Sequence, residues 1–117
     1  MTLLCDGPSD TDSRKIVELS KSIDPKIRLH ALKQMCPCKV RDDIDLLWDR
    51  IFEMVDDVDP GVRYQVLHTI CDGSPNHLED KIRGAIEKFN HDVDGKIRRK
   101  VHKVMAIYLR TGKWNVL

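Results

Sequence analysis

The chain has 117 residues, of which 41% are hydrophobic, 33% are charged and 5% are aromatic, and its formal net charge is +1. This length predicts one domain, and the composition excludes a disordered chain and predicts a core of aliphatic side chains. No apolar run approaches the roughly 18 residues that a membrane span requires, and the near-neutral charge favours no class of partner by itself.

Residues 1–10 contain Gly, Pro, Ser and Asp without any period, which predicts a flexible N-terminal arm. The start of the chain has neither the basic residues nor the long apolar stretch of a signal peptide. Four cysteines without such a signal indicate free thiols in a reducing compartment. We therefore expect a cytoplasmic protein.

Six helices are predicted in a domain of residues 11–112, from apolar residues that recur on one helical face. In chain order they are expected at about 11–22, from Asp24 to near Pro37, at about 40–56, from Asp59 to about Cys71, from Ser74-Pro75 onward, and from near Asp94 to a stop at Gly112.

A phrase of six residues recurs at a spacing of 35: Ile23 to Arg28, Val58 to Arg63, and Val93 to Arg98. Three copies at one period indicate a repeat array. In each copy an Asp can cap the following helix, which stabilises it by roughly 1 kcal/mol. Pro suits the first helical position, and the third copy has Gly95 there instead.

The phrase opens the second, fourth and sixth helices, which are therefore equivalent. The third and fifth helices match each other best at an offset of 38 residues. The first helix resembles the second half of a repeat. We accordingly predict two full helix pairs flanked by two half-repeats.

Paired antiparallel helices that recur every 35 to 38 residues, with Asp-Pro-x-(Val/Ile)-Arg opening one helix of each pair, resemble HEAT repeats of the armadillo-like class. The resemblance covers about residues 14–110 and is weakest in the third copy. It implies a short right-handed α-solenoid with the second, fourth and sixth helices on the convex side and the others on the concave side. It also implies a scaffold without chemistry of its own.

The charged residues of the phrase recur at the structural period, which favours a ladder of ion pairs between repeats over a phosphate site. We expect Arg63 to pair with Asp59 or Asp24. The predicted ladder comprises Asp24, Arg28, Asp59, Arg63, Asp94 and Arg98.

The cysteines are Cys5, the pair Cys36 and Cys38, and Cys71. A structural metal site needs two closely spaced Cys pairs or Cys with His at ligand spacing, and neither is present. We predict Cys36 and Cys71 to be core thiols, with a metal or redox role as the alternative. No catalytic residue, metal or cofactor is predicted, and nothing in the sequence supports an enzyme.

Charge is unevenly distributed along the chain. Residues 41–57 carry a net charge of −5 and residues 96–113 a net charge of +7. We expect an acidic concave groove that binds a protein or peptide partner of basic character, made by Asp42, Asp45, Asp49 and Glu53 and continued by Asp80, Arg83 and Glu87. The alternative is binding of nucleic acid or an acidic partner by a basic stripe of Lys96, Arg99, Lys100, Lys103 and Arg110.

The tail, residues 113–117, contains Trp114, Val116 and Leu117. Three apolar residues in a free tail are unusual, so we predict that they fold back onto the end of the array or contact a second subunit. The protein is accordingly expected to be a monomer or a weak homo-oligomer.

Overall fold

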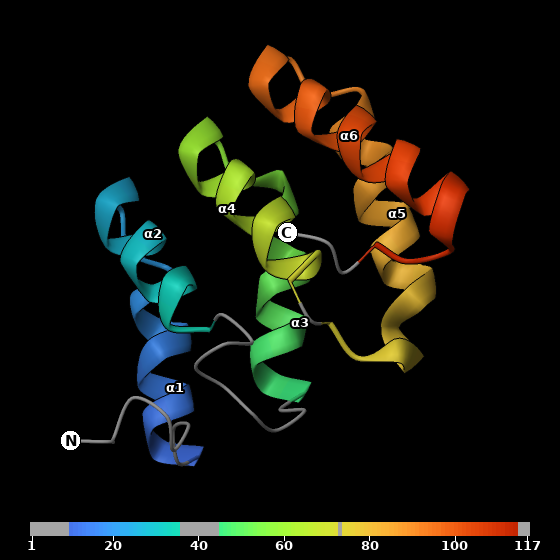
Figure 1. The fold of residues 1–117 in the computed structure, drawn as a ribbon. Helices are drawn as coiled ribbons and strands as arrows, with labels where there is room; N and C mark the ends of the chain where they lie inside the picture. Colours follow the sequence, from blue (N-terminus) through green and yellow to red (C-terminus); the bar gives the residue numbers. More distant parts are fainter. Residues whose placement is uncertain (1–9, 36–44, 73, 115–117) are drawn as a thin grey trace, which may run out of the picture.

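The computed structural model describes residues 10–35, 45–72 and 74–114, and all regular secondary structure in these residues is helical (Figure 1). The all-α prediction is confirmed for these residues. The α-helices are α1 (Asp10–Leu19), α2 (Pro25–Gln34), α3 (Asp45–Glu53), α4 (Pro60–Ile70), α5 (Glu79–Asn90) and α6 (Gly95–Thr111), and the 3₁₀ helices are η2 (Met54–Asp56) and η3 (Asn76–Leu78).

The three predicted N-caps are confirmed. Asp24 accepts a hydrogen bond from the backbone N–H of Lys26 at 2.9 Å, and Asp59 accepts one from Val62 at 3.0 Å. Asp94 caps α6 in the same way, from the N–H of Lys96. Each carboxylate thus satisfies a donor that has no partner inside its own helix. Gly112 ends α6 with φ 75, a left-handed conformation that glycine adopts without steric cost.

The fifth helix begins later than predicted. Pro75 has an extended backbone (ψ 144) and precedes η3, and α5 starts at Glu79. The expected cap-and-proline start therefore opens a 3₁₀ turn instead of the α-helix. The predicted beginning of the third helix, residues 40–44, lies outside the described residues.

The helices lie in two rows (Figure 1): α2, α4 and α6 form one and α1, α3 and α5 the other. Short turns join α1 to α2, η2 to α4 and α5 to α6, and the joined helices pack against each other. The structure thus groups the helices into three hairpins, each with the repeated phrase in its turn. This differs from the predicted two pairs and two half-repeats, because α1 packs against α2.

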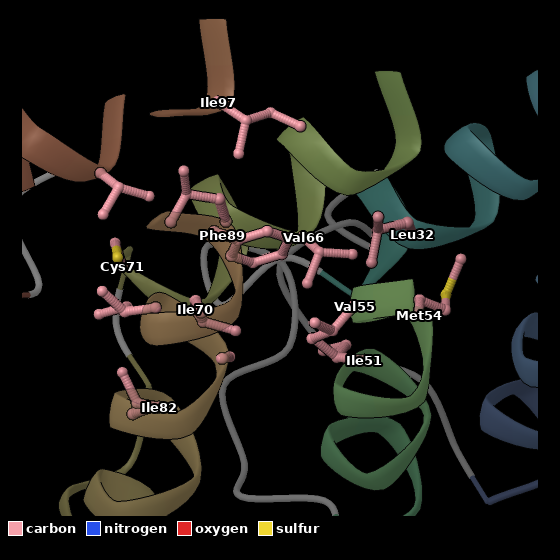
Figure 2. Packing of buried hydrophobic residues seen from close by; sticks show 14 of the residues in the cluster. Leu32, Ile51, Met54, Val55, Val66, Ile70, Cys71, Ile82, Phe89 and Ile97 are labelled. Atoms are coloured by element: carbon pink, nitrogen blue, oxygen red, sulfur yellow. The ribbon is translucent and has the colours of Figure 1, made fainter. Parts of the chain in front are cut away.

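One aliphatic core runs between the rows, and Figure 2 shows its packing. Ile51 of α3, Val66 of α4, Phe89 of α5 and Ile97 of α6 all contribute side chains to it. Trp48 of α3 also belongs to this core. Ile27 of α2 is 41% exposed, whereas its equivalents in α4 and α6, Val62 and Ile97, are fully buried.

Candidate functional site

Near the starts of α2 and α4, Arg28 and Arg63 each form an ion pair with an Asp of the next hairpin. Arg28 donates from Nε and Nη2 to Asp57 at 2.9 Å each. Arg63 donates in the same way to Asp92, at 2.8 and 3.0 Å. Two parallel bonds between a guanidinium and a carboxylate give both strength and a fixed geometry. We call these two interactions the turn clamps.

Each clamp also organises the two turns that it joins. The third nitrogen of Arg63, Nη1, donates to the carbonyl oxygens of Asp57 (2.8 Å) and Val58 (3.2 Å) in its own turn. Asp92 in turn accepts the backbone N–H of Asp94 at 2.8 Å. Arg28 makes the equivalent set of bonds, to Ser22, Ile23 and Asp57. Each clamp is therefore hydrogen-bonded to the backbone of both turns that it joins.

The environment of the clamps explains their protonation. In both pairs the Arg side chain is 12% exposed and the Asp side chain 8%. Burial raises the pKa of Asp92, but the hydrogen bonds from Arg63 and the Asp94 N–H, with the nearby positive charges, outweigh it and lower the pKa overall. The hydrogen bond to Asp92 likewise raises the pKa of Arg63. Both partners are held in their charged forms.

The predicted partners of Arg63 were wrong. It pairs with neither Asp59 nor Asp24, because those carboxylates are committed to capping helices. The ladder exists, but its acids are Asp57 and Asp92, two residues before each capping Asp. A structural role for Arg28 and Arg63 explains these contacts fully.

The acids predicted to form the groove lie on α3 and α5 and are exposed, namely Asp45, Asp49, Glu53, Asp80 and Glu87. Several carry basic partners that the prediction did not include. Asp49 lies 3.7 Å from Lys81, and Glu53 lies 3.2 Å from Arg50. The neighbouring Asp56 lies 2.9 Å from Lys88. The face therefore carries both signs of charge, and Asp42 lies outside the described residues.

A shallow groove, which we call the α3–α5 groove, runs between α5 on one side and α3 with η2 on the other. Phe52, Val55 and Ala85 form its apolar part, Lys81 and Lys88 line its edge, and its volume is about 220 Å³. The ammonium of Lys81 lies 5.8 Å from the Phe52 ring centre, within cation–π range. Sequence reasoning missed the two lysines and Phe52. The lysines follow from the register between two helices, which periodicity along one helix does not reveal.

Arg83, together with Glu87, lines a pocket between α5 and α6 instead of the α3–α5 groove. Its guanidinium lies 3.1 Å from Glu79, donates to the Tyr108 hydroxyl at 3.3 Å, and lies 5.9 Å from the ring centre of Trp114. Trp114 is itself buried and stacks on Tyr108 at 4.6 Å. The predicted fold-back of the tail is confirmed for Trp114, and Val116 and Leu117 lie outside the described residues.

The bases of the predicted stripe on α6 are exposed, apart from half-buried Lys100. The Lys100 ammonium lies 5.8 Å from the ring centre of Tyr64. Within the described part of the chain, none of Lys96, Arg99, Lys103 and Arg110 forms an ion pair with a carboxylate. This helix therefore keeps a positive surface that is free to meet an acidic group.

Cys71 is fully buried, and its burial raises the pKa of the thiol to about 12. The thiol is therefore protonated at neutral pH and a poor nucleophile or metal ligand. Cys5, Cys36 and Cys38 lie outside the described residues. Among residues 10–35, 45–72 and 74–114, no three His, Cys, Asp or Glu side chains gather in a way that could hold a metal ion.

Comparisons of the chain with family models, with curated proteins and with solved structures found no match. In the described residues, no helix has the length and apolar character needed to cross a membrane.

Proposed function

We propose that the chain is a non-catalytic, HEAT-like helical-repeat module that binds a protein or peptide on its α3–α5 face. The arrangement proposed with it is a short right-handed α-solenoid, with this face on the concave side. The recurrence of one clamp at successive turns and the two rows of helices support the repeat architecture.

The groove between α3 and α5 carries the proposal. It combines a half-buried Phe52 ring, beside buried Val55 and Ala85, with carboxylates along α3 and η2 and ammonium groups along α5. An apolar floor supplies affinity and flanking charges supply orientation, the usual division of roles in a protein interface. A peptide with basic residues beside one apolar anchor complements this surface, because Asp45 has no ion-pair partner within the described residues.

Selection from a displayed random-peptide library tests the proposal. Peptides enriched on the protein should contain Lys or Arg beside an apolar residue. Asp45→Lys should slow their association by about tenfold with little effect on stability, since exposed charges steer encounter. Glu18→Lys, a charge reversal at another exposed acid, on α1, is the matched control. Selection of acidic peptides, or equal binding to both variants, contradicts the proposal.

A second candidate is binding of nucleic acid by α6, favoured by its exposed bases without carboxylate partners. Fluorescence anisotropy with a labelled duplex oligonucleotide tests it. Binding through these bases should weaken steeply as salt rises and should be lost on reversing Lys103 and Arg110. Binding that is insensitive to salt contradicts this candidate.

A further inference from the structure

Arg98 begins a third turn clamp that no residue in the described chain completes. Like Arg28 and Arg63, it donates from Nη1 to a backbone carbonyl in its own turn, that of Asp92. Unlike them it is exposed, and its Nε and Nη2 meet no carboxylate within the described residues. The guanidinium is thus anchored at one nitrogen, and the edge that binds Asp in the other two turns is open.

The surface beside Arg98 is also exposed at positions whose equivalents in the first two hairpins are buried. In α2 and α4 the position four residues after the clamp Arg is a fully buried Leu, whereas in α6 it is exposed His102. Three positions further on, Met35 and Ile70 are buried, whereas Met105 is 37% exposed. Leu109, one turn beyond Met105, is 80% exposed. Positions that packing covers in the first two hairpins are therefore uncovered in α6.

A pocket adjoins this uncovered surface. It lies between α5 and α6, has a volume of about 220 Å³, and is lined by Arg83, Ile86, Glu87, Met105, Tyr108 and Trp114. Its walls are largely apolar side chains, with the Arg83 guanidinium over the Trp114 ring. The open guanidinium edge, the apolar strip and the pocket together make a surface suited to a folded partner.

We propose that this outer side of α5 and α6 is a docking surface for another helical protein, which contributes an Asp from the turn before one of its helices. The carboxylate would take the place that Asp57 and Asp92 take on Arg28 and Arg63. Charge complementarity identifies the occupant, because the chain itself shows twice which group this Arg geometry binds. The anchored guanidinium loses little freedom on binding. This surface is separate from the α3–α5 groove, so neither proposal depends on the other.

A second copy of the chain lacks the required acid. The position equivalent to Asp57 and Asp92 in the first hairpin is Ser22. Its hydroxyl accepts the Asp24 N–H at 3.1 Å, as the two aspartates accept their own backbone partners, but it cannot take two bonds from a guanidinium. The first hairpin is otherwise suited to be a partner, because Leu19 and Ile27 are exposed there. One substitution, Ser22→Asp, should supply the missing carboxylate.

A variant of the protein that carries Ser22→Asp can therefore serve as a surrogate partner. Ser22→Asp/Arg98→Ala has the acidic turn and no open Arg, so it can join the unmodified protein in one way only. Sedimentation velocity of an equimolar mixture should show association at least about tenfold tighter than with Ser22→Asn/Arg98→Ala, the gain typical of a charge-assisted bidentate pair. The asparagine control fills the same position without charge.

Replacing the unmodified protein by its Arg98→Ala variant should return association to the control value. Arg98→Lys should recover only part of the gain, because a lysine cannot form the fork. Circular dichroism and thermal unfolding of every variant separate loss of binding from loss of folding. Two results overturn the proposal: a surrogate that associates no better than its asparagine control, or one that associates equally well with the Arg98→Ala protein.

Discussion

Two sets of ion pairs link neighbouring hairpins, one at the turns and one between α3 and α5. At the turns, Arg63 and Asp92 are 12% and 8% exposed and share two short bonds. On the α3–α5 face, Lys88 of α5 and Asp56 of η2 are 60% and 71% exposed, although their shortest distance is a similar 2.9 Å. Distance alone therefore does not rank the two sets.

Burial and connectivity make the difference. A buried pair that loses one partner leaves an uncompensated charge, whereas an exposed pair returns both charges to water. The clamp is also bonded to backbone on both sides, and the Lys88 pair joins only two flexible side chains. We infer that the turn side maintains the stack of hairpins and that charges on the α3–α5 face can change without loss of the fold.

The largest effect is expected for Arg63→Ala. It leaves Asp92 buried without its guanidinium and frees two carbonyl oxygens in the turn to which Arg63 itself belongs. The cost should be about 3–5 kcal/mol, out of a total stability of about 6–18 kcal/mol for this length. Urea unfolding at neutral pH measures it.

The companion variant Arg63→Ala/Asp92→Asn sharpens this test. It removes the stranded charge and retains an amide oxygen for the Asp94 N–H, so it should recover part of the loss. An unchanged unfolding midpoint in Arg63→Ala would show that the clamp does not hold the hairpins together.

An intermediate effect is expected from acid. The folded-state pKa of Asp92 is lowered, so its stabilising contribution is complete above the unfolded value of about 3.9. It is lost as pH falls from about 4 through the lowered folded pKa. Unfolding free energies measured between about pH 5 and pH 2 should therefore fall more steeply for the unmodified protein than for Asp92→Asn. Parallel profiles would mean that this carboxylate is not specially stabilised.

The smallest effect is expected for Lys88→Ala. The pair with Asp56 is exposed to water on both sides, so its loss should cost less than about 1 kcal/mol. The small difference should shrink further in high salt. Thermal unfolding at two salt concentrations measures both. A loss as large as that of Arg63→Ala would remove the distinction between the two sets of pairs.

The sequence predicted the helices better than the contacts between them. Asp24, Asp59 and Asp94 were recognisable caps because each precedes Pro or Gly and an apolar stripe, which are local signals. The predicted all-helical class and the stop at Gly112 follow from equally local rules. The late start of α5 was missed because the chemistry of Ser74 and Pro75 suits either kind of helix.

The acids of the clamps could not be chosen from the repeated phrase. Arg63 and Asp59 are four residues apart, which favours a pair on one helix, but capping had already used that carboxylate. The true acid, Asp92, lies outside the phrase, and its equivalent in the first turn is Ser22, which conceals the period. The mixed charge of the α3–α5 face was similarly hidden, because the register of Lys81 against Asp49 depends on packing between helices.

Each clamp Asp accepts a hydrogen bond from the backbone N–H two residues later in the chain. Because of this bond, the opening of one turn is coupled to the opening of the next. The amide hydrogen of Asp94 is covered by Asp92, and Asp92 is held by Arg63 of the preceding turn. Exchange of that hydrogen with solvent therefore requires the contact between two hairpins to loosen, in addition to local fraying. In the same way, the amide hydrogen of Asp59 is covered by Asp57, and Asp57 is held by Arg28. Successive turns should consequently exchange as a coupled series, so that a disturbance at one reaches the next through a single carboxylate.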